Sequence, residues 1–314
     1  MGSHSTLRTA RRLSFVAAVG AVVAGAWTFA DPGLLHGPEA MQGSARGTAL
    51  VLLAVAVPVL LVSWWKVSRG SGPALLAAFG ALLYVVYNGV LFLFLTPFNA
   101  AFLLYVALFG SALWSVGYLC ATREVWTLGQ SVVEVAPVRG VAVYVWVVAV
   151  LNAAAWLAMV IPSLGRYPTP MLEGTGVQTN AIYVQDLAIW LPLAGVAGLW
   201  LWRRQARGGV VVGALLGMWV IEGLSIAVDQ WFGVRADPGS PVVSAALVGP
   251  FLALAALGLV PWWLLVRRAV PLVGHSSSNP PGPGDSGASS SAVPSSAVSS
   301  SAVSSSAGRR GRRR

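Results

Sequence analysis

Three carboxyl groups lie within long apolar stretches of the chain: Asp186, Glu222 and Asp229. Glu222, Ser225 and Asp229 are spaced i, i+3 and i+7, which places them on one face of a helix. A charge inside a bilayer costs about 2.5–3.5 kcal/mol on insertion scales, so acids at this depth are candidates for a functional role. No arginine or lysine is expected near Asp186 and Glu222, so at least one of the two should be protonated. Asp229 is close enough to an interface to be hydrated.

Other polar residues are predicted at similar depths. Tyr84, Tyr87 and Asn88 share a helical face through i, i+3, i+4 spacing, and Asn152 lies near the middle of another apolar stretch. We hypothesise a polar cavity, open to the outer side of the membrane, that is lined by Tyr87, Asn88, Asn152, Asp186 and Glu222.

The plainer alternative is interhelical hydrogen bonding, worth about 0.6 kcal/mol per contact on average. This alternative suits the tyrosines and asparagines better. For Glu222 two roles stay open: binding of a solute, ion or proton, or a protonated carboxyl with a structural role.

Composition indicates where these residues reside. Of 314 residues, 56% are hydrophobic and 10% charged, with a mean hydropathy of +0.74, whereas a soluble domain has about 25% charged residues. The apolar runs are about 20 residues long without period-2 alternation, which is typical of helices crossing a ~30 Å hydrocarbon core and not of barrel strands. We therefore predict an all-α, polytopic transmembrane helical bundle with spans at 12–30, 48–65, 73–96, 99–120, 140–162, 181–202, 209–231 and 242–266.

The predicted organisation is a cytoplasmic N-terminus (1–11), an eight-helix transmembrane domain (12–271) and a tail (272–314). The longest loops, 31–47, 121–139 and 163–180, are too short to hold a separate domain. The Ser/Ala/Pro-rich tail is predicted to be disordered, because it cannot bury apolar surface. Its end, Arg309–Arg314, either contacts anionic lipid or is solvated. The lipid bilayer is the expected partner, and no nucleic-acid partner is expected.

Positive charge predicts the orientation. One side of the membrane holds both termini together with Arg8, Arg11, Arg12, Lys66, Arg69, Arg123, Arg139, Arg203, Arg204, Arg207, Arg267 and Arg268. The other side holds Arg46, Arg166 and Arg235. The positive-inside rule then predicts a multi-pass plasma-membrane protein with both termini in the cytoplasm.

The first span has an alternative interpretation as a signal peptide. Arg11 and Arg12 precede it, and Thr28-Phe29-Ala30 loosely resembles a cleavage site. Its apolar core exceeds the usual length of about 7–15 residues, so we predict a retained helix. Cleavage would leave seven spans.

Gly209, Gly213 and Gly217 form a ladder of small residues that predicts close helix packing. Gly217 lies about 140° and Gly213 about 180° around the helix from Glu222, so the glycine and polar faces are expected to be separate. We find no convincing repeat between spans one to four and five to eight. No pair of Gly- or Pro-broken spans at matching positions is evident, although Pro58, Pro192, Pro250 and Pro261 are candidate kinks.

Several chemistries find no support in the sequence. Cys120 is the only cysteine, and the histidines, His4, His36 and His275, lie outside the apolar runs. No metal site, cofactor or phosphate-binding loop is predicted. We therefore expect a non-enzymatic membrane protein. The main alternative is a transporter or channel for a small solute or proton, and an intramembrane enzyme using Asp186 and Glu222 is the remote one.

Two segments carry a family resemblance. One runs from Tyr84 to Val106, YVVYNGVLFLFLTPFNAAFLLYV, and the other from Gln185 to Pro192, QDLAIWLP, followed by Trp202-Arg203-Arg204. They resemble uncharacterised multi-pass membrane proteins of high-GC bacteria. The resemblance covers spans three to seven and implies the same bundle architecture, with no activity to transfer.

Overall fold

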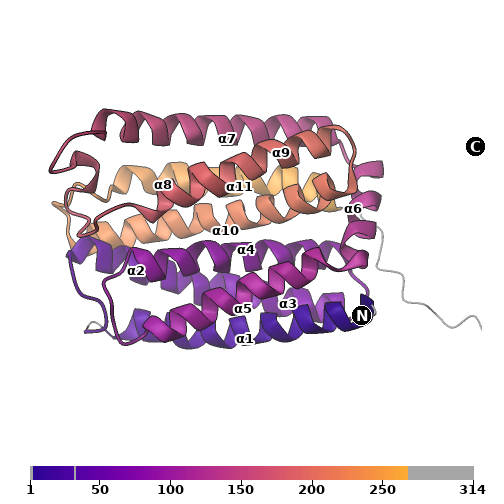
Figure 1. Cartoon of the computed structure of the whole chain (residues 1–314), viewed down its shortest axis with the longest axis horizontal. Helices are drawn as coiled ribbons and strands as arrows, with labels where there is room; N and C mark the ends of the chain where they lie inside the picture. The colour runs from indigo at the N-terminus through magenta and orange to yellow at the C-terminus, as the bar shows by residue number, and fades with distance from the viewer. Residues whose placement is uncertain (1–2, 32, 268–314) are drawn as a thin grey trace, which may run out of the picture. The chain divides into compact units, whose positions relative to one another are not determined.

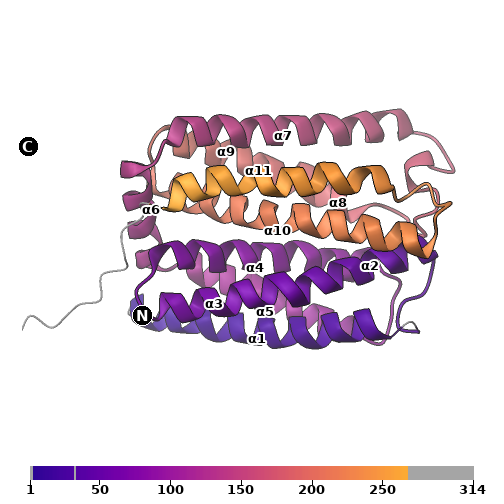
Figure 2. The same ribbon diagram turned by 180° about the vertical axis from the view of Figure 1, so that it is seen from behind.

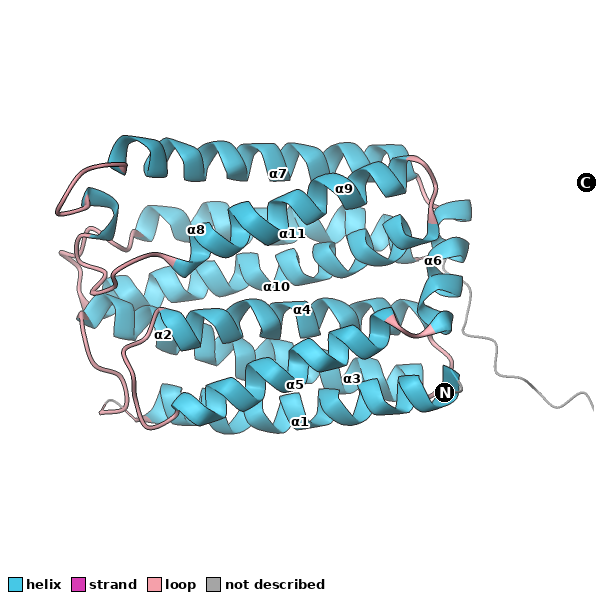
Figure 3. Cartoon of the chain, viewed as in Figure 1, coloured by secondary structure: helices cyan, strands magenta, loops and turns pink. Residues whose placement is uncertain are grey.

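The computed structural model describes residues 3–31 and 33–267, so the tail expected at 272–314 lies outside the described residues. Within that part, helices alternate with loops at the two ends of the bundle (Figure 3). Eight helical segments of the described chain are long and apolar enough to cross a membrane. The predicted all-α polytopic bundle is therefore confirmed.

The spans are, in chain order, α1 (Ser3–Ala30); α2 (Glu39–Val51) with η1 (Leu52–Ala56) and α3 (Val57–Val67); α4 (Gly72–Phe94); α5 (Phe102–Cys120); α7 (Val138–Val160) with η2 (Ile161–Ser163); α8 (Ala181–Gln185) with η4 (Asp186–Trp190) and α9 (Leu191–Trp202); α10 (Ala206–Ala236); and η5 (Ala245–Leu247) with α11 (Val248–Val266). We call the end of the bundle where α1 begins the N-terminal end, and the opposite one the far end.

Two segments expected as loops are helical. The second span begins at Glu39, within the loop expected at 31–47. Most of the loop expected at 121–139 is α6 (Arg123–Val135), which lies across the N-terminal end (Figure 1). With 13 residues, α6 is about 20 Å long and too short to span the membrane. It forms because its apolar side chains repeat at helical spacing and are buried against the bundle: Val125, Leu128, Val132 and Val133.

Helices α4 and α10 lie side by side in the middle of the bundle (Figures 1 and 2). Helix α10 also contacts α2, α6, α9 and α11, and α4 is the most buried span. By contrast, the fifth and eighth spans, which contain α7 and α11, bury the smallest share of their residues, as expected for helices that face lipid. The core of the bundle is thus the contact between α4 and α10.

Glycines set the distance between these central helices. A methyl group on Gly80 of α4 would come within 2.9 Å of the Ala214 carbonyl oxygen and 3.0 Å of the Gly217 Cα. A methyl group on Gly209 would meet the Gly129 carbonyl of α6 at 2.7 Å, and one on Gly213 would meet Leu76 at 3.1 Å. All three glycines of the ladder therefore lie at close helix contacts, which only small residues permit.

The expected separation of glycine and polar faces is not observed. Gly217 and Glu222 both contact α4, through Gly80 and Asn88 respectively. The two helices run along each other, so α4 meets successive faces of α10 at different depths. Close packing at Gly80 and the polar contact at Asn88 therefore belong to one helix interface.

Two spans contain a five-residue π-helical segment just before a proline. Segment η1 precedes Pro58, and η4 precedes Pro192. Proline has no amide hydrogen, and its ring clashes with the carbonyl four residues earlier, so the hydrogen-bond ladder shifts there. These are the second spans of the two halves, at matching positions. The expectation of no proline-broken pair was therefore wrong.

Candidate functional site

The centre of the candidate site is a hydrogen bond between α4 and α10. Asn88 Nδ2 donates to Glu222 Oε2 over 2.7 Å. Asn88 is buried, whereas Glu222 is partly exposed. Glu222 lies midway along the 31 residues of α10, which is the position furthest from both ends of that helix. One turn from Asn88, the hydroxyls of Tyr84 and Ser225 are 3.0 Å apart.

The Asn88 amide is only half satisfied. Its Nδ2 also donates to the Tyr84 backbone carbonyl over 3.2 Å, but its buried Oδ1 has no hydrogen-bond partner. A buried amide oxygen without a partner is destabilising. Asn88 Oδ1 is therefore an unpaired acceptor next to the Glu222 carboxyl.

Asp186 forms a second polar centre, at the start of η4. Trp156 of α7 donates its indole N–H to Asp186 Oδ2 over 2.7 Å, and Tyr87 is a further hydrogen-bond partner of this carboxyl. Asp186 is buried, with 6% of its surface exposed. Two donors therefore satisfy this buried carboxyl inside the bundle.

The two centres adjoin through consecutive residues of α4. Tyr87 contacts Asp186, and Asn88 contacts Glu222. Asp186 and Glu222 are close enough for an electrostatic interaction. In the described part of the chain, no arginine, lysine or histidine forms an ion pair with either acid.

The two remaining candidates form no hydrogen bond to these centres in the described residues, although Asp229 is close enough to Glu222 for an electrostatic interaction. Asp229 is near the far end of α10, where its Oδ1 accepts from Gln230 Nε2 over 3.1 Å and its backbone lies against Gly47 of α2. Asn152 is half-buried on α7, and within the described residues no hydrogen bond joins it to either centre. The structure therefore brings together Tyr84, Tyr87, Asn88, Asp186, Glu222 and Ser225.

Three residues that sequence reasoning did not select complete the site around Asp186. These residues are Trp156, Gln185 and Trp190. The Trp190 indole donates to Gln185 Oε1 over 3.0 Å, and Gln185 Nε2 lies 3.5 Å from the Tyr87 carbonyl oxygen. A glutamine directly before an intramembrane aspartate was a usable signal, because it too must be satisfied inside the bilayer.

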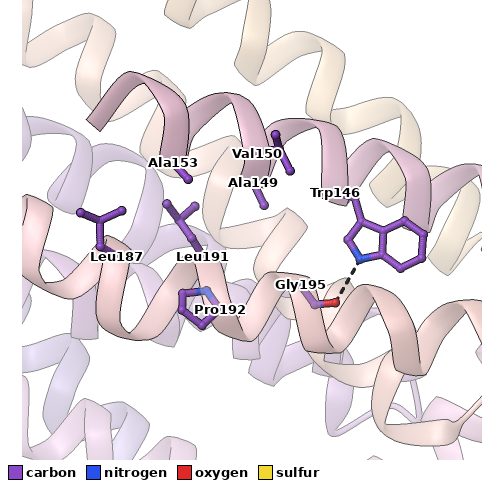
Figure 4. Close-up of a pocket in the computed structure, with 8 residues that line it drawn as sticks. All are labelled: Trp146, Ala149, Val150, Ala153, Leu187, Leu191, Pro192 and Gly195. Carbon is purple, nitrogen blue, oxygen red and sulfur yellow. Dashed lines mark hydrogen bonds between the residues drawn. The ribbon is translucent and has the colours of Figure 1, made fainter. Parts of the chain in front are cut away.

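An apolar groove lies elsewhere in the described chain, between α7 and the η4–α9 segment (Figure 4). It has a volume of about 300 Å³ and is lined by Trp146, Ala149, Val150, Ala153, Leu187, Leu191, Pro192 and Gly195. Its walls are apolar apart from the Trp146 indole, which donates to the Gly195 carbonyl over 3.0 Å. This groove therefore does not form the polar cavity hypothesised from the sequence.

Metal chemistry has no set of ligands in the described residues, where no three His, Cys, Asp or Glu side chains gather closely enough to hold an ion. Comparisons of the chain with family models, curated proteins and solved structures find no match.

Proposed function

We propose that the protein is a non-enzymatic integral membrane transporter or channel that moves protons, alone or together with a small solute. This proposal rests on the position and contacts of Glu222. It lies in the middle of the central helix, contacts Asn88, and has no cationic partner among the described residues. An ionisable group at such a position is expected to mark a proton or ion pathway.

The two acids have different environments, which suggests different roles. Asp186 is buried and accepts two hydrogen bonds, so it is suited to a fixed position beside the site. Glu222 accepts one from Asn88 and is partly exposed, so it is suited to gain and lose a proton. We assign Glu222 as the transported or coupling proton site, and Asp186 as a neighbouring carboxyl that its two hydrogen bonds hold in place.

The second candidate function is structural: the hydrogen bonds at this site only hold the helices together. The Tyr84–Ser225 contact fits that role, since both hydroxyls satisfy each other. The Asn88–Glu222 contact fits it less well, because Asn88 Oδ1 is left unpaired. A site built for structure alone would satisfy both ends of a buried amide.

For the location, we propose the plasma membrane with both termini in the cytoplasm. Arginines that stack on tryptophans at the N-terminal end support this, because both residue types favour the membrane interface there. These pairs are Arg69 with Trp65, Arg139 with Trp202, Arg207 with Trp200, and Arg267 with Trp263. At the far end, Arg235 stacks on Trp231.

Orientation can be tested by cysteine labelling. Tyr167, at the far end, is 96% exposed, so a Tyr167→Cys variant in a Cys120→Ser background should react with an impermeant maleimide in intact cells. Native Cys120 lies at the N-terminal end and should react only after permeabilisation. The reversed labelling pattern would place the termini outside.

Proton flux in liposomes tests the function. Purified protein is reconstituted with a pH-sensitive dye inside, and an imposed pH gradient is followed with and without a counter-ion pathway. Wild type should dissipate the gradient faster than empty liposomes, and Glu222→Gln, which keeps the shape and removes the titrating group, should not.

The matched control is Glu134→Gln on α6. Glu134 is exposed and bonded only to Gln130 of its own helix, so this variant should retain the wild-type flux. Equal flux in wild type, Glu222→Gln and empty liposomes, across a panel of small solutes, would reject transport and leave the structural role of Glu222.

A further inference from the structure

The helical elements of the two halves repeat at one fixed separation. Asn88 and Glu222, which bond to each other, are 134 positions apart. The same separation relates the first residues of η1 and η4 (Leu52, Asp186), of α3 and α9 (Val57, Leu191), and of α4 and α10 (Gly72, Ala206). Three coinciding helix starts indicate a repeated unit.

The turns that join these helices have the same backbone conformation. Gly70 has φ +86°, and Arg204, at the same separation, has φ +53°, the one non-glycine residue with positive φ in the described chain. Gly70 N donates to Val67 O and Arg204 N to Leu201 O, each over 2.9 Å. An arginine in this unfavourable region is explained if the turn is inherited from a copy in which glycine was used.

Packing between neighbouring spans repeats as well. Gly89 of α4 packs against Phe109 of α5, and Gly223 of α10 packs against Ala255 of α11. Gly89 and Gly223 have the 134-residue separation. Helices α5 and α11 both have 19 residues, and Phe109 and Ala255 are each the eighth residue of their helix. The fourth span of each half therefore meets the third at equivalent residues.

The two halves meet as a two-fold pair does. In a two-fold interface, residues on the axis contact their own copies. Asn88 contacts its equivalent Glu222, and Gly80 contacts its equivalent Ala214. These two contacts are about 12 Å apart along α4, so the axis runs along the helices. This is the arrangement of parallel repeats related by an axis along the membrane normal.

The symmetry is broken at the first span of each half, for a chemical reason. Helix α1 is bound to α5 by hydroxyl contacts, Ser14 with Ser115 and Thr28 with Tyr105, each over 2.8 Å. The equivalents of Ser14 and Thr28 in the fifth span are Val148 of α7 and Pro162 of η2, and the equivalents of Ser115 and Tyr105 in α11 are Pro261 and Phe251, so neither bond can form. Helix α7 instead packs on α9, where Trp146 bonds the Gly195 carbonyl.

We infer that the membrane domain is a tandem duplication of one four-span unit, and that Asn88 and Glu222 are the two copies of one proton-binding position on the pseudo-two-fold axis. The repeat relation stands independently, and the identification of the proton rests on the proposed function. The titratable groups that act on this pair are Tyr84 and Tyr87 from α4, Asp186 from η4 and Asp229 from α10.

The pair can keep its hydrogen bond in both protonation states. With Glu222 ionised, Asn88 Nδ2 donates to Oε2, as observed. With Glu222 protonated, its O–H can donate to Asn88 Oδ1 once the amide makes a half-turn. The unpaired Oδ1 is the acceptor that such a donor needs. Only Glu222 gains or loses the proton. The second repeat therefore supplies the acid, Glu222, and the first repeat supplies the amide, Asn88.

An exchange of the carboxyl and amide groups between the two positions tests this inference in the full-length protein. The double variant Asn88→Asp with Glu222→Gln moves the carboxyl from α10 to α4 and the amide in the opposite direction, without changing side-chain volume. The single variants hold two amides (Glu222→Gln) or two carboxyls (Asn88→Asp). Thermal unfolding in detergent and proton flux in liposomes are measured for all four proteins at pH 5 and pH 8.

If the positions are equivalent, the double variant should recover at least half of the flux and of the unfolding temperature that the worse single variant loses. Glu222→Gln should reduce flux to the level of empty liposomes, because it removes the titrating group. Asn88→Asp should unfold at lower temperature at pH 8 than at pH 5, because two ionised carboxyls repel. Losses that simply add in the double variant overturn the shared position.

Failure of the proposed function is distinguishable from failure of this inference. If wild type carries no protons, the unfolding temperatures alone decide whether the two positions are equivalent. If wild type carries protons and the exchange recovers neither flux nor stability, Glu222 is a transport residue without a symmetric partner. If Asn88→Asp does not fold, the single variants Asn88→Ser and Glu222→Ser are compared instead. Equivalent positions predict that the two substitutions change the unfolding temperature by similar amounts, and unequal changes contradict the inference.

Discussion

The indole nitrogen of Trp156 lies 2.7 Å from Oδ2 of Asp186, which joins α7 to the π-helical start of η4 inside the membrane. Helix α7 is otherwise among the least buried spans. This one contact therefore holds a largely lipid-facing helix to the candidate site.

Removing the indole donor should reveal the charge state of Asp186. A hydrogen bond to an ionised group contributes about 1.5–3 kcal/mol, and one to a neutral group about 0.5–1.5 kcal/mol. If Asp186 is ionised, Trp156→Phe should lower the free energy of unfolding by the larger amount, and if it is protonated, by the smaller amount. The control is Trp146→Phe on the same helix, which removes a bond to a neutral carbonyl. Equal losses, measured by thermal unfolding in detergent, would mean that Asp186 is protonated.

The central helix contact should not tolerate a methyl group. In Gly80→Ala, the new Cβ would lie 2.9 Å from a backbone oxygen of α10, which cannot move independently. Overpacking of this kind typically costs about 1–3 kcal/mol. Gly110→Ala on α5 is the control, because nothing lies within 4 Å of its added methyl. A Gly80→Ala protein as stable as Gly110→Ala would show that α4 and α10 can separate without loss.

A substitution in the turn between α3 and α4 should cause a smaller loss of stability. Gly70→Ala should lower stability by about 1–2 kcal/mol, the cost of a left-handed conformation for a residue with a side chain. Arg204 already bears that cost at the equivalent turn, where its side chain bonds the Val133 carbonyl of α6. Arg204→Gly therefore relieves strain and removes a bond together, and its unfolding temperature should change less than that of Gly70→Ala.

The spans and the grouping of polar residues by depth could be predicted from the sequence. Apolar length fixes which segments cross the membrane, and position along a helix fixes depth, so Asn88 and Glu222 were expected at similar levels. The contact of Trp156 with Asp186 could not be predicted. It depends on how each helix is rotated, and the π-helical segment before Pro192 shifts that rotation.

The repeat also escaped sequence analysis, for a physical reason. Lipid-facing positions accept any apolar side chain, so few identities survive between the halves; Pro58 with Pro192, Arg69 with Arg203, and Gly89 with Gly223 are among them. The backbone keeps the relation better than the side chains, because helix starts and turn conformations depend on a few positions. Helix α6 was missed because it is too short to give the apolar run that identifies a span.

The hydroxyl contacts between α1 and α5 give the last prediction. Ser115 Oγ lies 2.9 Å from the Ala10 carbonyl oxygen and 2.8 Å from Ser14 Oγ, so it reaches α1 twice. Ser115→Ala should lower stability by about 1 kcal/mol, within the range for interhelical bonds in membranes. Ser111, one turn earlier, bonds only its own helix at Leu108, so Ser111→Ala should cost much less. Similar unfolding temperatures for the two variants would show that these hydroxyls do not hold α1 in the bundle.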